Sequence, residues 1–240
     1  MIEYNYVNFK GERKMNNCKI KNKIITISGE PASGKSTVVR ALQRKYEEMG
    51  NVVHIVSTGK IFRELAVKAY LNMYPDKTEE DVDLAALQLD VAFAKKRSEI
   101  DSKIDTEIYR RGKQINEIER PNDVYIIDSR LAWHNIPESY AVRLTVCEKI
   151  AGQRVFADKT RGGEDAYDTV EDAINKTRER KLGEIERYKK RYGLDLTKKE
   201  NYNLIVDTSY IQTEELADMI INGEKSYRLG KSIDDDSDER

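Results

Sequence analysis

One nine-residue segment restricts what this chain can fold into more than any other: Gly29-Glu-Pro-Ala-Ser-Gly-Lys-Ser-Thr37. It follows an apolar run, Lys23–Ser28, that predicts a strand, and it leads into Ser36–Met49, which predicts a helix. The pattern G-x-x-x-x-G-K-[ST] in this context is typical of a loop that binds nucleotide phosphates through its backbone N–H groups and the start of the helix. The residues of this phosphate loop are Gly29, Glu30, Pro31, Ala32, Ser33, Gly34, Lys35, Ser36 and Thr37.

Three side chains carry the chemistry that this pattern predicts. Lys35 is expected at the β- and γ-phosphates of ATP, and the Ser36 hydroxyl is expected to bind Mg²⁺. Asp128 ends a later predicted strand, where a carboxylate can hold a water on the magnesium ion. The alternatives are a glycine-rich connection without a ligand and an acid that only caps the next turn.

Five β-branched runs predict strands, and helical stretches separate them. Each run is apolar almost throughout, as in strands that are covered on both faces of a parallel sheet. The alternation predicts an α/β fold, a three-layer sandwich with a five-stranded parallel sheet. The strands are expected at Lys23–Ser28, Val52–Val56, Val124–Asp128, Val142–Val146 and Leu204–Asp207. The helices are expected at Ser36–Met49, Lys60–Tyr74, Glu79–Lys96, Ile100–Glu119, Glu148–Asp158, Val170–Tyr192 and Thr213–Asn222.

The spacing of these elements also predicts the domain organisation. The stretch between the second and third strands, 59–122, is too long for one crossover helix, so an inserted helical subdomain for the acceptor is expected at about 60–120. Gly162-Gly163 predicts a flexible segment and a mobile lid at about 154–168. Residues 1–22 predict a flexible extension, 23–222 the main domain, and 223–240 an acidic disordered tail.

The composition excludes several classes of function. The chain has 42 Lys and Arg against 43 Asp and Glu, so it lacks the overall basic charge of a nucleic-acid or membrane-surface binder. Its two cysteines and two histidines leave little room for a disulfide framework, a Cys-based zinc site or a Ser–His–Asp mechanism. No apolar run approaches a membrane span of roughly 18–20 residues. We expect a cytoplasmic monomer without nucleic-acid or membrane partners.

Arginines follow several of the predicted strands. Ligands of open α/β sheets bind at the carboxyl ends of the strands, so these side chains can converge on a second anion that faces the phosphate loop. They are Arg63, Arg130, Arg154 and Arg161, with Lys159 beside them. Each of them taken singly could instead be a solvated surface charge.

One predicted helix, Val170–Tyr192, adds a charged stripe. Offsets of four and three residues place Arg180, Glu184 and Arg187 on one face, where the acid can hold two guanidinium groups in register. A solvated network of i,i+4 pairs is the alternative. If the stripe is functional, a lid delivers its arginines to the phosphoryl group in transfer.

The acceptor of that group can be narrowed by its chemistry. A hydroxyl acceptor needs a base near its proton, whereas a phosphate monoester is already mostly ionised at pH 7 and needs only charge neutralisation and alignment. A site rich in arginine in a chain with two histidines favours the phosphate. These features point to a nucleoside monophosphate kinase.

The ordered set of motifs resembles the cytidylate kinase family, in its compact archaeal-type form, over about 22–222. The segments that carry the resemblance are Ile25–Thr37, Ser57–Ala66, Ile127–Trp133, Arg187–Asp195 and Tyr202–Ser209. The chain departs from the family pattern at Ser129, where a glycine is usual, at Trp133, and at Glu107, near an expected arginine.

The resemblance implies particular roles and a particular acceptor. Thr58 and Arg63 bind the phosphate of CMP, Arg130 lies at the acceptor, and the stripe Arg180, Glu184 and Arg187 surrounds both nucleotides. Arg154 and Arg161 are expected on the ATP side. The leading hypothesis is Mg·ATP-dependent phosphorylation of CMP or dCMP.

Two alternatives stay open. One is a related kinase for another nucleotide, a small-molecule hydroxyl or a nucleic-acid end, with Asp128 as its base. The other is a non-catalytic nucleotide-binding regulator. Asp101 and Asp105 share a predicted helix face and could read the amino group of a base, but two solvated acids on an amphipathic helix are the favoured interpretation.

Overall fold

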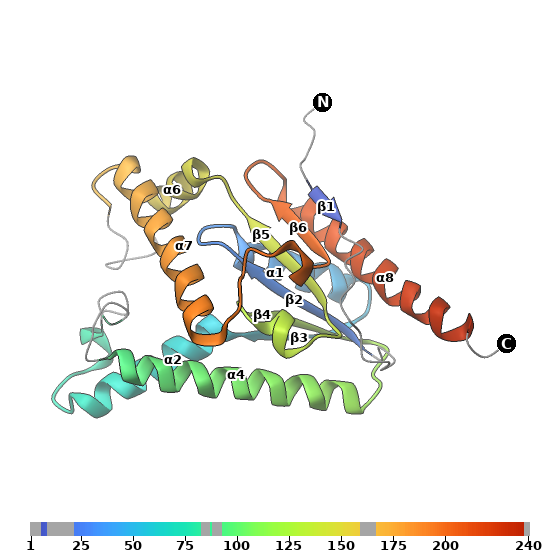
Figure 1. The fold of residues 1–240 in the computed structure, drawn as a ribbon, viewed down its shortest axis with the longest axis horizontal. Helices are drawn as coiled ribbons and strands as arrows, with labels where there is room; N and C mark the ends of the chain where they lie inside the picture. The colour runs from blue at the N-terminus through green and yellow to red at the C-terminus, as the bar shows by residue number, and fades with distance from the viewer. Residues whose placement is uncertain (1–5, 9–21, 83–86, 88–92, 159–166, 238–240) are drawn as a thin grey trace.

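A six-stranded sheet forms the centre of the molecule (Figure 1). The computed structural model describes residues 6–8, 22–82, 87, 93–158 and 167–237. The strands lie in the order β1-β6-β5-β2-β4-β3, with β1 antiparallel to β6 and the other five parallel. Their bounds are β1 Tyr6–Asn8, β2 Lys23–Gly29, β3 Val52–Ser57, β4 Asp123–Asp128, β5 Tyr140–Thr145 and β6 Leu204–Asp207. The five parallel strands confirm the predicted sheet.

Helices cover both faces of this sheet and complete the three layers (Figure 1). On one face, α1 and α8 pack against apolar side chains such as Ile25 and Leu144. On the other face, α2, α4 and α5 pack against Ile24 and Ile127. The helices are α1 Lys35–Glu48, α2 Thr58–Met73, α4 Ala94–Glu117, α5 Ala132–Asn135, α6 Glu148–Ala157, α7 Val170–Tyr192 and α8 Thr213–Ser237, and short 3-10 turns lie at Glu79–Asp81 and Lys199–Asn201. None of these helices is long and apolar enough to cross a membrane.

The crossover from β3 to β4 is the part of the domain that the sequence pattern describes least well. Two helices were expected over Glu79–Lys96 and Ile100–Glu119, but one helix, α4, runs continuously from Ala94. Residues 97–99 contain neither Gly nor Pro, and the Arg97 N–H already bonds to the Phe93 carbonyl at 2.8 Å, so nothing interrupts the helix there. Of the first expected helix, 83–86 and 88–92 lie outside the described residues.

Parts of both expected flexible tails form regular secondary structure, at Tyr6–Asn8 and over 223–237. Tyr6–Asn8 pairs with β6 and adds a strand at that edge of the sheet. At the other end, α8 continues through Ser237 instead of ending at Asn222. Tyr227 packs on the core and its ring lies 5.6 Å from that of Tyr140, while Glu224 pairs with Arg228 at 3.0 Å. The acidic composition of 223–240 predicted a disordered tail, because composition does not show the contacts of Tyr227 and Glu224.

The helix pair α6 and α7 has a tight crossing that makes its own prediction. A Cβ on Gly152 of α6 would lie 2.8 Å from the Cα of Ile174 on α7, a backbone atom that cannot turn away. Gly152→Ala therefore forces the two helices apart, and we expect it to lower the free energy of unfolding by about 1–3 kcal/mol. Denaturant unfolding measures the change.

Gly183→Ala is the matched control for that substitution. A Cβ at Gly183 of α7 has no atom within 4 Å, so the gain in helix propensity should raise stability by about 0.5–1 kcal/mol. Equal effects of the two alanines would contradict the tight crossing.

Candidate functional site

The phosphate loop joins β2 to α1 and has the backbone that its sequence demands. Gly34 precedes the helix with a φ of 79°, and Ala32 has a φ of 60°, a left-handed conformation that residues other than glycine adopt only under constraint. The N–H groups of Thr37 and Val38 bond to the Gly34 carbonyl at 3.0 and 3.1 Å and close the first turn of α1. The amides before these two, at Lys35 and Ser36, are too close to the start of the helix to have a carbonyl acceptor within it.

The interior of the loop fits a phosphate group. The Ser33 hydroxyl is buried and, within the described part of the chain, has no hydrogen-bond partner. A Cβ on Gly29 would lie 2.6 Å from this hydroxyl oxygen, so only glycine leaves the space open. An unpartnered buried donor beside a cradle that a methyl group would fill suits a phosphate oxygen.

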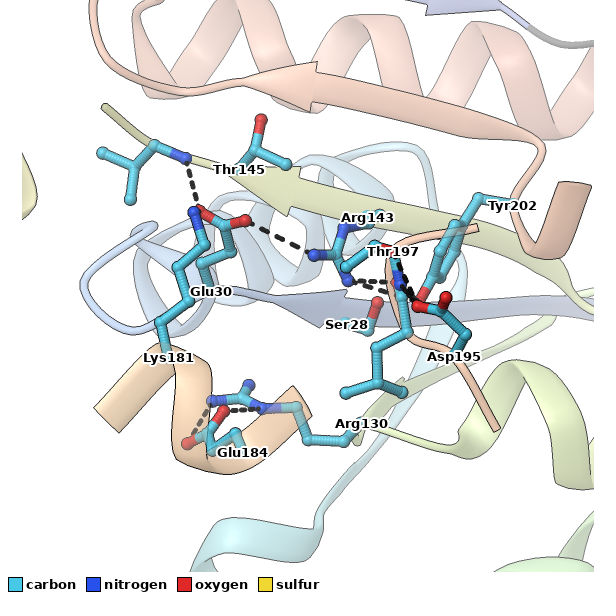
Figure 2. A network of polar contacts seen from close by, with 12 residues as sticks. Ser28, Glu30, Arg130, Arg143, Thr145, Lys181, Glu184, Asp195, Thr197 and Tyr202 are labelled. Carbon is cyan, nitrogen blue, oxygen red and sulfur yellow. Dashed lines mark hydrogen bonds and ion pairs between the residues drawn. The ribbon is translucent and has the colours of Figure 1, made fainter. Parts of the chain in front are cut away.

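Four charged side chains gather at the mouth of the loop, and three of them are joined by ion pairs. Arg130, which follows β4, donates from Nε to Glu184 at 2.8 Å and from a terminal nitrogen to the other carboxylate oxygen at 3.2 Å (Figure 2). Arg180 pairs with the same carboxylate at 3.6 Å. Lys35 interacts electrostatically with all three. The predicted pairing of Arg180 with Glu184 is therefore present, and Arg130 joins it.

The crowding of cations changes the protonation of this cluster. Burial, together with the neighbouring Arg130, lowers the pKa of Lys35 to about 7. Burial would raise the pKa of Glu184, but Arg130, Arg180 and Lys35 outweigh it and lower that pKa. Three cations held around one carboxylate form a site prepared for a polyanion.

If the loop binds ATP, the lowered pKa of Lys35 predicts proton uptake on binding. Phosphate oxygens stabilise the ammonium form, so above pH 7 a lysine that is neutral in the free protein must take a proton from the buffer. At pH 8 we expect an uptake of about one proton, and near pH 7 about half of that, because the free group has a pKa of about 7. Calorimetric titrations in two buffers of different ionisation enthalpy measure the uptake. Identical binding enthalpies in the two buffers at pH 8 would contradict it.

Asp128 ends β4 and contacts the junction of β3 and α2. Its carboxylate accepts the Ser57 hydroxyl at 3.3 Å, and its carbonyl accepts the Thr58 hydroxyl at 3.1 Å. Its negative charge also favours the charged form of Lys35. Arg63, one turn into α2, is exposed, and its guanidinium lies 3.7 Å from where a Cβ of Gly59 would be. Thr58 and Asp128 thus lie side by side, and the role of the exposed Arg63 at the acceptor stays a prediction.

The remaining predicted residues are placed differently. Arg154 donates to the Ala32 carbonyl at 3.2 Å and to the Thr208 carbonyl at 2.5 Å, so it braces the phosphate loop against the segment after β6. Its contact with ATP stays a prediction. Arg187 has no hydrogen bond or ion pair to Glu184 among the described residues; its charge instead acts on Asp101 of α4 and opposes the rise of that carboxyl's pKa. Arg161, with Lys159 and most of the expected lid, lies outside the described residues.

The two acids on α4 turn out to face α7 instead of solvent. Asp101 lies 3.7 Å from a guanidinium nitrogen of Arg191, and Asp105 accepts the Tyr192 hydroxyl at 2.5 Å. Burial raises the pKa of Asp101, and Arg187 and Arg191 oppose that rise. The simpler expectation of solvated acids is therefore wrong for this pair.

Two functional candidates escaped the sequence analysis: Arg143 and Lys181. Both pair with Glu30 of the phosphate loop, at 3.3 and 3.0 Å (Figure 2). Arg143 is the only charged residue in β5, and its position inside a buried strand was a signal that could have found it. Lys181 offered no such signal on a helix crowded with charge.

The fold and this site define a P-loop phosphotransferase of the kinase type. Residues 24–210 match the cytidylate kinase-like family. The cytidylate kinase of Methanocella arvoryzae is 33% identical over 186 residues, which cover 78% of this chain and 87% of that protein. The cytidylate kinase of Methanocorpusculum labreanum is 31% identical, with 80% and 90% covered. The chain belongs to the cytidylate kinase-like family.

Two further relatives add information of a different kind. An S-adenosylmethionine-dependent nucleotide dehydratase of Lacinutrix mariniflava is 27% identical over 208 residues, which cover 86% of this chain but 37% of that protein. A solved structure of an uncharacterized protein from Eubacterium ventriosum has a TM-score of 0.56 and 15% identity, with 85% of this chain and 99% of that chain covered. The first match concerns a part of a longer protein, and the second supports the fold.

Proposed function

We propose that the protein transfers the γ-phosphate of ATP to CMP or dCMP. The observation that carries the proposal is the cluster of Lys35, Arg130, Arg180 and Glu184 at the mouth of the phosphate loop, in a chain of the cytidylate kinase-like family. Cations aligned between two phosphates neutralise the charge in transfer, and no proton has to be removed first. The relatives that carry the name cytidylate kinase support CMP as the acceptor.

Mg²⁺ belongs to this proposal, and the residues suit it. No three His, Cys, Asp or Glu side chains gather as a metal site within the described ranges. Mg²⁺ typically takes one or two protein oxygens and completes its shell with phosphates and water. Ser36 and Asp128 are the oxygens that we propose for it. The ion supplies charge neutralisation on the phosphates.

The test is an ADP-release assay with ATP and each ribo- and deoxyribonucleoside monophosphate in turn. We expect the highest kcat/KM with CMP or dCMP. Absence of turnover with every pyrimidine monophosphate would overturn the proposal. Turnover of an acceptor without a phosphate would favour the hydroxyl kinase, with Asp128 as base, and ATP binding without any turnover would favour the regulator.

Selection of cytosine is the finer part of the proposal. A carboxylate accepts a hydrogen bond from the N4 amino group of cytosine but meets only an acceptor oxygen on uracil. Asp101, half-buried between α4 and α7, is the acid we propose for this contact. Asp101→Asn is expected to lower the ratio of kcat/KM for CMP over UMP by about tenfold. An unchanged ratio would remove Asp101 from the specificity site.

A further inference from the structure

A carboxylate sits inside the phosphate loop, where its charge opposes the ligand. Glu30 is 8% exposed, so water screens it little from phosphates bound in the same loop. Two cations and one amide hold it: Arg143 at 3.3 Å, Lys181 at 3.0 Å and the Val146 N–H at 3.4 Å. The loop can accept a polyanion only while those cations neutralise this acid.

The two cations differ in how they are attached to the molecule. Arg143 belongs to the core: it lies in β5, bonds to the Leu196 carbonyl at 2.6 Å and lies over the ring of buried Tyr202. Lys181 belongs to α7 and reaches across to Glu30 from outside the sheet (Figure 2). Arg143 is thus a fixed partner of Glu30, and Lys181 is a partner that is present only when α7 lies against the loop.

The middle of α7 depends on such polar contacts. The buried residues of this helix, Ala173 and Thr177, lie in its first half, and Leu182 is 57% exposed. From 178 to 187, the contacts that lead to the phosphate loop and to Arg130 are the pair of Lys181 with Glu30 and the pair of Glu184 with Arg130. These pairs link the middle of α7 to the loop and to the end of β4.

We infer that Lys181 is a positioning residue that couples α7 to the phosphate loop through Glu30. Its pair with Glu30 holds α7 where Arg180 and Glu184 meet Lys35 and Arg130, and it removes the charge that would repel ATP. The inference rests on the proposed function only in taking ATP as the ligand of the loop. Lys181 itself acts through Glu30 and through α7, without a contact to substrate.

The first test is ATP affinity, measured by calorimetry without any acceptor. Lys181→Gln leaves Glu30 with one cation, and we expect the Kd for ATP to rise about tenfold. Lys181→Arg keeps the charge and should hold the Kd for ATP within about twofold of that of the wild-type protein. This result would show that the charge of residue 181, and not only the length of its side chain, supports ATP binding. Lys190→Ala, an exposed lysine on the same helix, is the matched control and should change nothing. Wild-type affinity in Lys181→Gln would overturn the inference.

A double-mutant cycle then asks whether Lys181 acts through Glu30. In a Glu30→Gln background there is no carboxylate to neutralise, so Lys181→Gln should have little further effect on ATP affinity. Additive effects of the two substitutions would place the action of Lys181 elsewhere and overturn the coupling. The cycle measures ATP affinity without an acceptor. A failure of CMP turnover would therefore contradict the proposed function but would not affect the conclusion about Lys181 and Glu30.

Hydrogen exchange supplies a readout that does not depend on the double variant folding. In Lys181→Gln, amides of 178–187 should exchange faster than in the wild-type protein, whereas those around Ala173 and Thr177, packed on α6, should not change. Unchanged exchange over 178–187 would show that the pair does not hold the helix and would overturn the inference.

Discussion

Lys35→Met is expected to lower kcat/KM by on the order of 10²–10³-fold, the loss typical when one preorganised donor to developing charge is removed. Methionine keeps the unbranched shape of the side chain but removes the ammonium group that the phosphates require. A coupled ADP-release assay measures the loss. Activity within tenfold of the wild-type protein would contradict the assignment of Lys35 to the transferring phosphates.

The same substitution should leave the protein folded, which separates this loss from instability. Lys35 lies among cations in a half-buried position, and this desolvation already lowers its pKa, so its charge is unfavourable in the free protein. We therefore expect the Tm of Lys35→Met to equal or exceed that of the wild-type protein. Lys45→Met is the control on the same helix, because Lys45 pairs with Asp218 on α8 and should not affect turnover.

Glu184→Ala is expected to have the largest effect on stability. It leaves Arg130, Arg180 and Lys35 around a vacated, largely buried position, and removal of one partner of a buried ion pair costs about 3–5 kcal/mol. ATP supplies the lost negative charge, so it should stabilise the variant more than it stabilises the wild-type protein. Urea unfolding with and without ATP measures both effects.

Glu186→Ala provides the matched control for that experiment. Glu186 is exposed on the same helix, and its loss should change the free energy of unfolding by no more than about 0.5 kcal/mol. Equal stabilisation of the wild-type protein and of Glu184→Ala by ATP would show that Glu184 does not stand in for the nucleotide charge.

Local patterns predicted the parts of this fold whose causes are local. The strand before the phosphate loop, the loop and the helix after it follow from residues that are neighbours in the chain, and β6 was predicted at its observed bounds. Where an element depends on distant partners, the pattern was insufficient. α8 extends because Tyr227 meets Tyr140, and β1 exists only because β6 offers an edge.

The residues of the candidate site could likewise be predicted where the signal is local in the sequence and not where it depends on a distant partner. Lys35 and Ser36 are identified by a motif, and Arg130, Arg180 and Glu184 by their places after a strand and on one helix face. Glu30 counted only as one position of the loop pattern, because its partner Arg143 is 113 residues away in the sequence. A variable position of a motif carries no local sign of such a pairing.

The single tryptophan of the chain is built into this site. Its indole Nε1 donates to the Arg130 carbonyl at 2.9 Å, and its ring meets the edge of Tyr202, the ring over which Arg143 lies. Trp133 thus contacts Arg130 directly through a hydrogen bond, and it contacts Arg143, the partner of Glu30, indirectly through the ring of Tyr202. The tryptophan fluorescence of the protein therefore comes from a chromophore beside the proposed nucleotide site, which offers a label-free optical signal for following occupancy in real time.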